Sequence, residues 1–289
     1  MTNATLTRPA AATPPVVQAS RLSFSGILRS EWIKALSLRS IRWSIATSIV
    51  AGLAMSLAMS FALRALSGED LIGSHAEYLM TVTGFPANLL SLVFGVLGVF
   101  LFSSEYASGM ILSTLTAAPR RGQLMAAKAV VLTVIAVAIA AVVVTSGVLI
   151  AVAVMPESAS AVWTLQTLTS LLGTTIFLVA IALFSFAVAG ILRSTAGAIT
   201  VVVGVAFLLP NILQIVAQLS NWAWVQLVWN YLPTSLGMML GTGIAEGSAP
   251  VSEASVHYPG YAEALVALAV WVIVPMAIAA RSFFARDAK

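Results

Sequence analysis

Six long apolar runs without a charged side chain constrain this chain more than any other feature. A bilayer core about 30 Å thick requires about 20 such residues in a helix. Lipid offers no partner to an exposed backbone amide, and the runs lack the period-two alternation of barrel strands. We therefore expect an all-α polytopic membrane protein with six transmembrane helices, at approximately residues 44–63, 79–102, 129–154, 162–192, 196–219 and 264–280.

The composition of the chain also indicates a membrane protein. The exact helix boundaries are uncertain for two of the six runs. Hydrophobic residues make up 60% of the chain and charged residues only 8%, whereas soluble domains carry roughly 25% charged residues. The run 79–102 contains Gly84 and Pro86, so we expect its helix to start near Phe85. The run 162–192 is longer than one span needs, which predicts a tilt, an extension beyond the bilayer or a start in an outer interfacial turn.

The distribution of lysine and arginine predicts the orientation, because cytoplasmic loops retain these residues. With the N-terminus inside, the outer set is Arg64 alone and both termini are cytoplasmic. The net charge of +4 is then a signature of membrane orientation and does not indicate a nucleic-acid surface. The thirteen inner residues are Arg8, Arg21, Arg29, Lys34, Arg39, Arg42, Arg120, Arg121, Lys128, Arg193, Arg281, Arg286 and Lys289.

The segments outside the spans differ in character. Residues 1–20 are rich in Ala, Thr and Pro, which predicts a disordered cytosolic tail. Residues 21–42 hold an amphipathic helix at 22–40, and residues 43–289 form the six-helix transmembrane domain. Within that domain, 103–128 is a polar cytosolic segment. Residues 221–260 are too polar to span and too apolar for a free loop, and we expect them to re-enter the outer leaflet.

The amphipathic helix is predicted to lie in the membrane interface and to contact lipid. Its apolar side places Trp32 at headgroup depth, while its basic side faces anionic lipid. Glu31 breaks the pattern because it projects from the apolar side. It either pairs with Lys34 one turn further on, which we favour, or contacts a protein partner.

The sequence lacks the residue types that several classes of function require. The chain has no cysteine and only two histidines, His75 and His257, so we expect neither a metal site nor a catalytic base. None of its three lysines follows a glycine, so no phosphate-cradling loop is present and any ATP hydrolysis must lie on another polypeptide. We also find no ionisable side chain in the central part of any span, which disfavours an ion-coupled carrier.

Uncharged polar residues remain as candidates for a substrate pathway. One set shares a face of the fourth span, and a second follows Pro210, a predicted kink, in the fifth. They could line a pathway or form hydrogen bonds between helices, the commoner use. The two sets are Trp163, Thr167, Ser170 and Thr174, and Asn211, Gln214 and Gln218.

Four short segments resemble the permease subunits of bacterial type-2 ABC exporters, over approximately residues 21–289. They are SEWIKALSLRS, EYASGMILSTLTAAPRRGQLMAAK, LRSTAGA and NYLPTSLG. The resemblance implies an N-terminal elbow helix, an outer re-entrant helical pair and a plasma-membrane location. It also implies two permease copies, or two related permeases, with two separate ATPase subunits that hold ATP and Mg. The coupling segment that seats on the ATPase would contain Glu105, Tyr106, Gly109, Pro119 and Arg120.

We expect Glu105 to have a coupling or structural role, because solvation alone does not explain an acidic residue in a basic loop beside a span. Arg120, Arg121 and Lys128 are interpreted mainly as anchors that keep the loop inside. Two other functions stay open: an ion-coupled secondary transporter or channel, and a membrane subunit without transport that serves immunity or sensing. The cargo does not follow from the sequence, although the uncharged pathway favours a hydrophobic or amphipathic molecule.

Overall fold

The computed structural model describes residues 23–66, 74–107, 109–110, 121–220, 222–245 and 257–285, which form helices and no strand. The expected tail at 1–20 lies outside the described residues. Six helical stretches are long and apolar enough to cross a membrane, as the sequence predicts. The helices are α1 (Phe24–Ser37), α2 (Arg39–Leu66), α3 (His75–Ala107), α5 (Arg121–Val154), η1 (Pro156–Ala161), α6 (Leu165–Leu192), α7 (Thr195–Val203), η2 (Gly204–Leu208), α8 (Leu209–Ser220), α9 (Ala223–Asn230), α10 (Pro233–Gly241) and α11 (Tyr261–Ala285).

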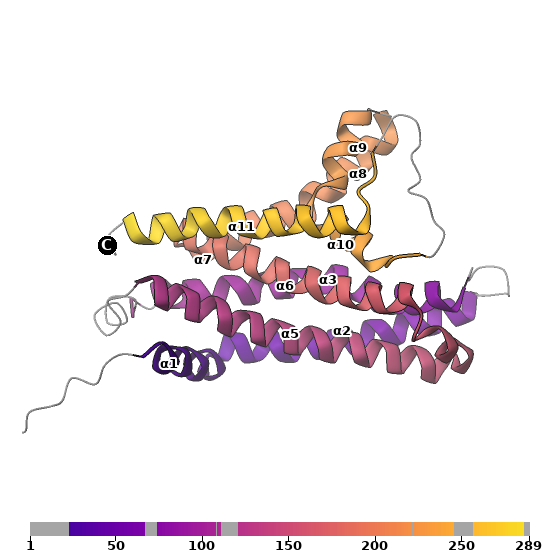
Figure 1. Cartoon of the computed structure of the whole chain (residues 1–289), viewed down its shortest axis with the longest axis horizontal. Coiled ribbons are helices and arrows are strands. Elements are labelled where there is room, and N and C mark those ends of the chain that lie inside the picture. The colour runs from indigo at the N-terminus through magenta and orange to yellow at the C-terminus, as the bar shows by residue number, and fades with distance from the viewer. Residues whose placement is uncertain are drawn as a thin grey trace, which may run out of the picture.

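The long helices lie side by side as a bundle, with α1 at one end (Figure 1). We call that end, where α3 finishes and α5 begins, the α1 end. Here Arg193 donates a hydrogen bond to the carbonyl of Ser282 (2.9 Å), and Arg121 donates one to that of Phe283 (3.3 Å). At the opposite end Arg64 donates to the carbonyl of Val154. Among the described residues, the other lysines and arginines belong either to α1 or to the parts of α2, α5, α6 and α11 nearest the α1 end.

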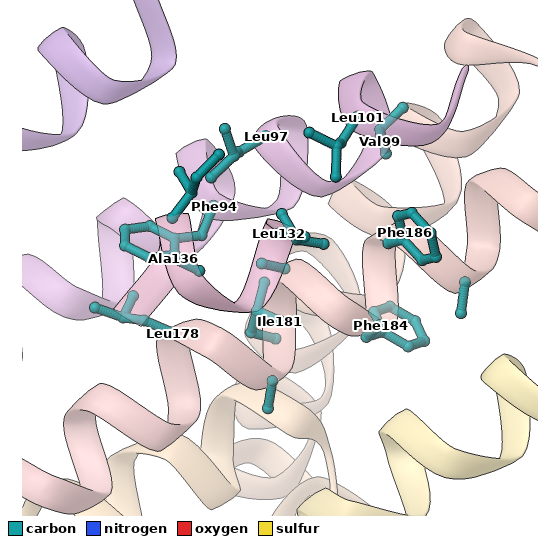
Figure 2. Packing of buried hydrophobic residues seen from close by; sticks show 14 of the residues in the cluster. Phe94, Leu97, Val99, Leu101, Leu132, Ala136, Leu178, Ile181, Phe184 and Phe186 are labelled. Atoms are coloured by element: carbon teal, nitrogen blue, oxygen red, sulfur yellow. The ribbon is translucent and has the colours of Figure 1, made fainter. Parts of the chain in front are cut away.

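The core of the bundle lies between α3, α5 and α6. Figure 2 shows Phe94 and Leu97 of α3 in the same packed layer as Leu132 of α5 and Ile181 of α6. The closest approach is at Gly98, where an added Cβ would lie 2.1 Å from the carbonyl oxygen of Ala182. A glycine is therefore required for α3 and α6 to pack this closely.

Helix α3 corrects one expectation from the sequence. It begins at His75, not near Phe85, and continues through Pro86. Ser74 starts the helix by accepting a hydrogen bond from the amide of Glu77 (3.1 Å). A proline removes one backbone donor, but membrane helices tolerate this loss where neighbouring helices cover the site, and Pro86 is buried.

A short helical turn precedes the fourth crossing, whose length suggested a tilt, an extension beyond the bilayer or such a turn. The short helix η1 precedes α6, and Thr164 caps α6 by accepting a hydrogen bond from the amide of Thr167 (3.3 Å). At its other end, Arg193 adopts a left-handed conformation with φ of 53° and ends the helix.

The fifth crossing is interrupted, and the break involves a neighbouring helix. The π-turn η2 separates α7 from α8, and α8 leaves the bundle together with α9 (Figure 1). Pro210 has no N–H to offer the carbonyl of Ala206 one turn earlier. That carbonyl accepts a hydrogen bond from Thr234 of α10 instead. The kink expected at Pro210 thus takes the form of a π-turn, in which the Ala206 carbonyl accepts a hydrogen bond from outside the helix.

The described part of the segment 221–260 contains two short helices with different surroundings. Trp222 and Trp224, at the start of α9, are exposed and stacked at 5.9 Å between ring centres. Helix α10 returns to the bundle, where Leu236 and Leu240 are fully buried. An added Cβ at Gly237 would lie 2.3 Å from the ring of Phe177, so this glycine lets α10 lie directly on α6.

Candidate functional site

Four charged side chains meet at the α1 end, and they come from three helices. Helix α1 supplies Glu31 and Lys34, the last turn of α3 supplies Glu105, and α5 supplies Lys128. Lys34 lies 2.8 Å from Glu31 and 3.0 Å from Glu105. Lys128 lies 2.6 Å from Glu31 and 3.0 Å from Glu105. We call these four residues the charge cluster.

Three members of the charge cluster are almost fully buried. The exposed fraction of the side chain is 4% for Glu31, 5% for Glu105 and 7% for Lys128, whereas Lys34 is 42% exposed. Burial of an ion is costly unless an opposite charge and hydrogen bonds compensate it. Two acids and two bases give the cluster a net charge of zero, and this balance allows three charges to be buried together.

The pKa of Lys34 follows from these contacts. Partial burial opposes its charge, but hydrogen bonds to Glu31 and Glu105 outweigh that effect and raise the pKa above its ordinary value. Lys34 therefore stays protonated throughout the physiological range, and its contribution to stability is lost only above its ordinary pKa of about 10.5, in alkaline solution.

Helix α1 presents Glu31 to the bundle because of its spacing. Ile27, Glu31 and Ala35 lie four residues apart and form the buried stripe of the helix. Ser23 caps the helix by accepting a hydrogen bond from the amide of Gly26 (3.2 Å). The pair of Glu31 with Lys34 that the sequence favoured is present, and Lys128 is a second partner. Trp32 lies outside this buried stripe and is 38% exposed.

Sequence reasoning missed the part played by Lys128, which it interpreted mainly as a topological anchor. The side chain belongs to the buried stripe of α5, between Leu124 and Leu132. A signal was available, because a lysine in one apolar stripe and an acid in another predict a buried pair. Arg121 does contact the end of α11, and Arg120 lies outside the described residues.

The other residues expected in the coupling segment are placed only in part. Tyr106 is half-buried, stacks on Phe102 at 5.6 Å and lies under the guanidinium of Arg193 at 5.7 Å. Gly109 follows α3 with φ of 70°, a left-handed conformation that favours glycine. Pro119 and Arg120 lie outside the described residues. The structure therefore joins Glu105 and Tyr106 to the bundle and leaves the middle of 103–128 undescribed.

The sequence matches the family described as ABC-2 family transporter protein over residues 27–211, more than half of the chain. The chain belongs to this family. A search of curated proteins finds no match. The family identifies a membrane component of ABC transport, and the match covers all four members of the charge cluster.

The polar set expected in the fourth crossing faces inward. Thr167, Ser170 and Thr174 are buried, and Ser170 donates a hydrogen bond to the carbonyl of Gly241 on α10. Trp163 does not share their face, because it precedes α6 and is 81% exposed. For Ser170, the structure therefore shows a hydrogen bond between helices.

The polar set of the fifth crossing lies elsewhere. Asn211, Gln214 and Gln218 are exposed on α8, and the Asn211 amide donates to the carbonyl of Phe207 (2.6 Å). The structure does not bring this set together with that of α6. Within the described residues, moreover, no group of three or more His, Cys, Asp and Glu side chains could hold a metal ion.

Proposed function

We propose that this chain is the permease subunit of an ATP-driven exporter in the bacterial plasma membrane, with the α1 end in the cytoplasm. A separate ATPase subunit, which binds ATP and Mg, would dock on segment 103–128. Eight of the nine described lysines and arginines belong to the α1 end and Arg64 alone to the other. Because cytoplasmic ends retain basic residues, this distribution supports the orientation.

The observation that carries the proposal is the charge cluster. Glu105 lies in the last turn of α3, where segment 103–128 begins, and it is bound to α1 through Lys34 and to α5 through Lys128. A force applied to this segment would therefore move three helices together. ATP-driven transport requires such a connection, because closure of the ATPase has to displace transmembrane helices.

The low burial of two crossings at the flanks of the bundle supports the presence of a partner permease. In the apolar windows of the α7–α8 and α11 crossings only 17% of residues are buried, compared with 67% for α6. Polar side chains exposed to hydrocarbon are unfavourable. We infer that a second copy or a related permease covers α8, and that Asn211, Gln214 and Gln218 face the substrate pathway there.

The test replaces Glu105 in the complex of the full chain with the ATPase that copurifies with it. We expect Glu105→Ala to abolish stimulation of ATP hydrolysis by a transported molecule, while membrane insertion and basal hydrolysis remain. Glu105→Gln, which keeps the shape and loses the charge, should lose part of the stimulation. Glu157→Ala is the matched control, because Glu157 is an exposed acid at the opposite end.

Two results would contradict the proposal. Undiminished stimulation in Glu105→Ala would remove the coupling role of the charge cluster. Transport driven by an ion gradient, in proteoliposomes that contain this chain alone, would instead identify a secondary transporter.

A further inference from the structure

A cavity of about 330 Å³ lies at the end of the bundle opposite the α1 end. One face of α3 forms its first wall, α6 contributes Thr174 and Phe177, and α10 contributes Gly237, Met238 and Gly241. Its volume falls at the lower end of the range typical of small-molecule pockets, about 300–1,000 Å³. The space inside the charge cluster, in contrast, is about 80 Å³. Of these two spaces, only the cavity opposite the α1 end is thus large enough for an organic ligand.

Two polar atoms in the wall of this cavity are buried without a hydrogen bond to any described residue. They are the hydroxyl oxygen of Thr174, whose residue is 2% exposed, and the amide oxygen of Asn88. The neighbouring Thr175 shows the usual arrangement, because its hydroxyl donates to the carbonyl of Leu171 (2.9 Å). A buried polar group without a partner costs about 1–3 kcal/mol, so its presence at a cavity indicates a missing partner.

The wall changes in character with depth. Glu77 is exposed at the start of α3 and marks the mouth, whereas Asn88 lies eleven residues further along, about 16 Å deeper at 1.5 Å per residue. Between them, the wall is mainly apolar and includes Met80, Phe85 and Phe177. Among the residues that the structure describes, Glu77 is the one charged residue that lines the cavity.

We propose that this cavity binds an amphiphilic small molecule, neutral or cationic, with an uncharged hydrogen-bonding group at its inner end. Such a group would pair with Thr174 and Asn88, while the apolar body lies along Met80 and Phe177. A membrane phospholipid fits less well, because its hydrocarbon tails would occupy the inner end and leave both polar atoms without partners. A role for the ligand as export cargo rests on the proposed function, whereas the binding itself does not.

The first experiment fills the cavity. An added Cβ at Gly84, which lines the cavity, meets no atom within 4 Å, so leucine there would project into open space. Gly204 is the matched control, a helical glycine outside the cavity with the same open surroundings. The full-length protein in nanodiscs would be photolabelled with a diazirine-bearing dodecane-1,12-diol, and the labelled peptides identified by mass spectrometry. We expect at least tenfold less labelling of α3, α6 and α10 in Gly84→Leu, and no change in Gly204→Leu.

The second experiment tests the polar inner end. Thr174→Val keeps the shape of the side chain and removes the hydroxyl, so it should weaken labelling by the diol about five- to tenfold, the worth of one hydrogen bond. Labelling by the matched diazirine-bearing dodecane should not change. Equal labelling by both probes, unaffected by Thr174→Val, would identify a lipid-filled groove and overturn the proposal. So would diol labelling that Gly84→Leu leaves intact. Neither experiment needs the ATPase, so failure here is distinct from failure of the coupling test.

Discussion

The two ends of this bundle contain buried polar groups in opposite arrangements. At the α1 end, Glu31, Glu105 and Lys128 are buried and charged, and ion pairs hold them around a space of about 80 Å³. At the opposite end, Thr174 and Asn88 are uncharged and have no described partner for their buried oxygens beside a cavity of about 330 Å³. Helix α3 passes through both.

The difference lies in what each kind of buried polar group requires of its surroundings. Charged groups in a low-dielectric interior are stable only when their partners are fixed, so the α1 end has to be rigid. Neutral polar groups are less costly to leave unpaired, so the opposite end can retain an open space for a ligand. We therefore expect substitutions to have large effects on stability at the α1 end and small ones around the cavity.

The largest expected effect is that of Lys128→Met. It leaves two buried acids with one half-exposed lysine, and breaking a buried ion pair from one side costs about 3–5 kcal/mol. The melting temperature of the protein in nanodiscs measures this loss. Lys34→Met is the matched control and should cost only about 1 kcal/mol, because Lys34 is 42% exposed.

The double variant Lys128→Met with Glu105→Gln should recover most of the lost stability, since it restores the charge balance. If the double variant is less stable than Lys128→Met alone, the charge cluster is not held together by charge.

A smaller effect on stability should come from substituting two glycines of α3, one closely packed and one beside open space. Gly98→Ala would force a Cβ to within 2.1 Å of the carbonyl of Ala182 and should cost about 1–3 kcal/mol. Gly84→Ala meets open space and should stabilise the helix by up to about 1 kcal/mol. Parallel melting curves compare them, and equal losses would contradict the close packing of α3 on α6.

The smallest effect should be that of Thr174→Val on stability. Removal of a buried hydroxyl without a partner should be neutral or stabilising by about 1 kcal/mol. Ser170→Ala, one turn earlier, breaks the hydrogen bond to Gly241 and should cost about 1 kcal/mol. A loss in Thr174→Val equal to that in Ser170→Ala would show that the Thr174 hydroxyl has a partner after all.

The sequence predicted the six crossings well, because the requirement for apolar length in a bilayer is local in sequence. It failed at Phe85, where proline and glycine were expected to start the helix. Whether a proline ends a membrane helix depends on which neighbours cover it, and Pro86 is buried in the bundle.

Only part of the candidate site was predicted from the sequence, because the rest again depends on how distant helices pack. Local spacing revealed Glu31 beside Lys34, and the position of Glu105 in a basic loop marked it as unusual. The contact of both acids with Lys128 depends on how three helices meet, over sequence separations that no helical period describes. Likewise, spacing grouped Trp163 with Thr167, but the turn before α6 separates them.

The hydrogen bond from Thr234 to the carbonyl of Ala206 has a consequence for motion. Thr234 begins the same short helix that supplies Gly237 and Met238 to the cavity wall, and Ala206 lies where the fifth crossing turns outward. If the two separated, the Ala206 carbonyl would lose this donor, and an unsatisfied backbone group in a membrane costs several kcal/mol. We therefore expect a displacement of α8 to be coupled, through the Thr234 hydroxyl, to the position of α10 in the cavity wall.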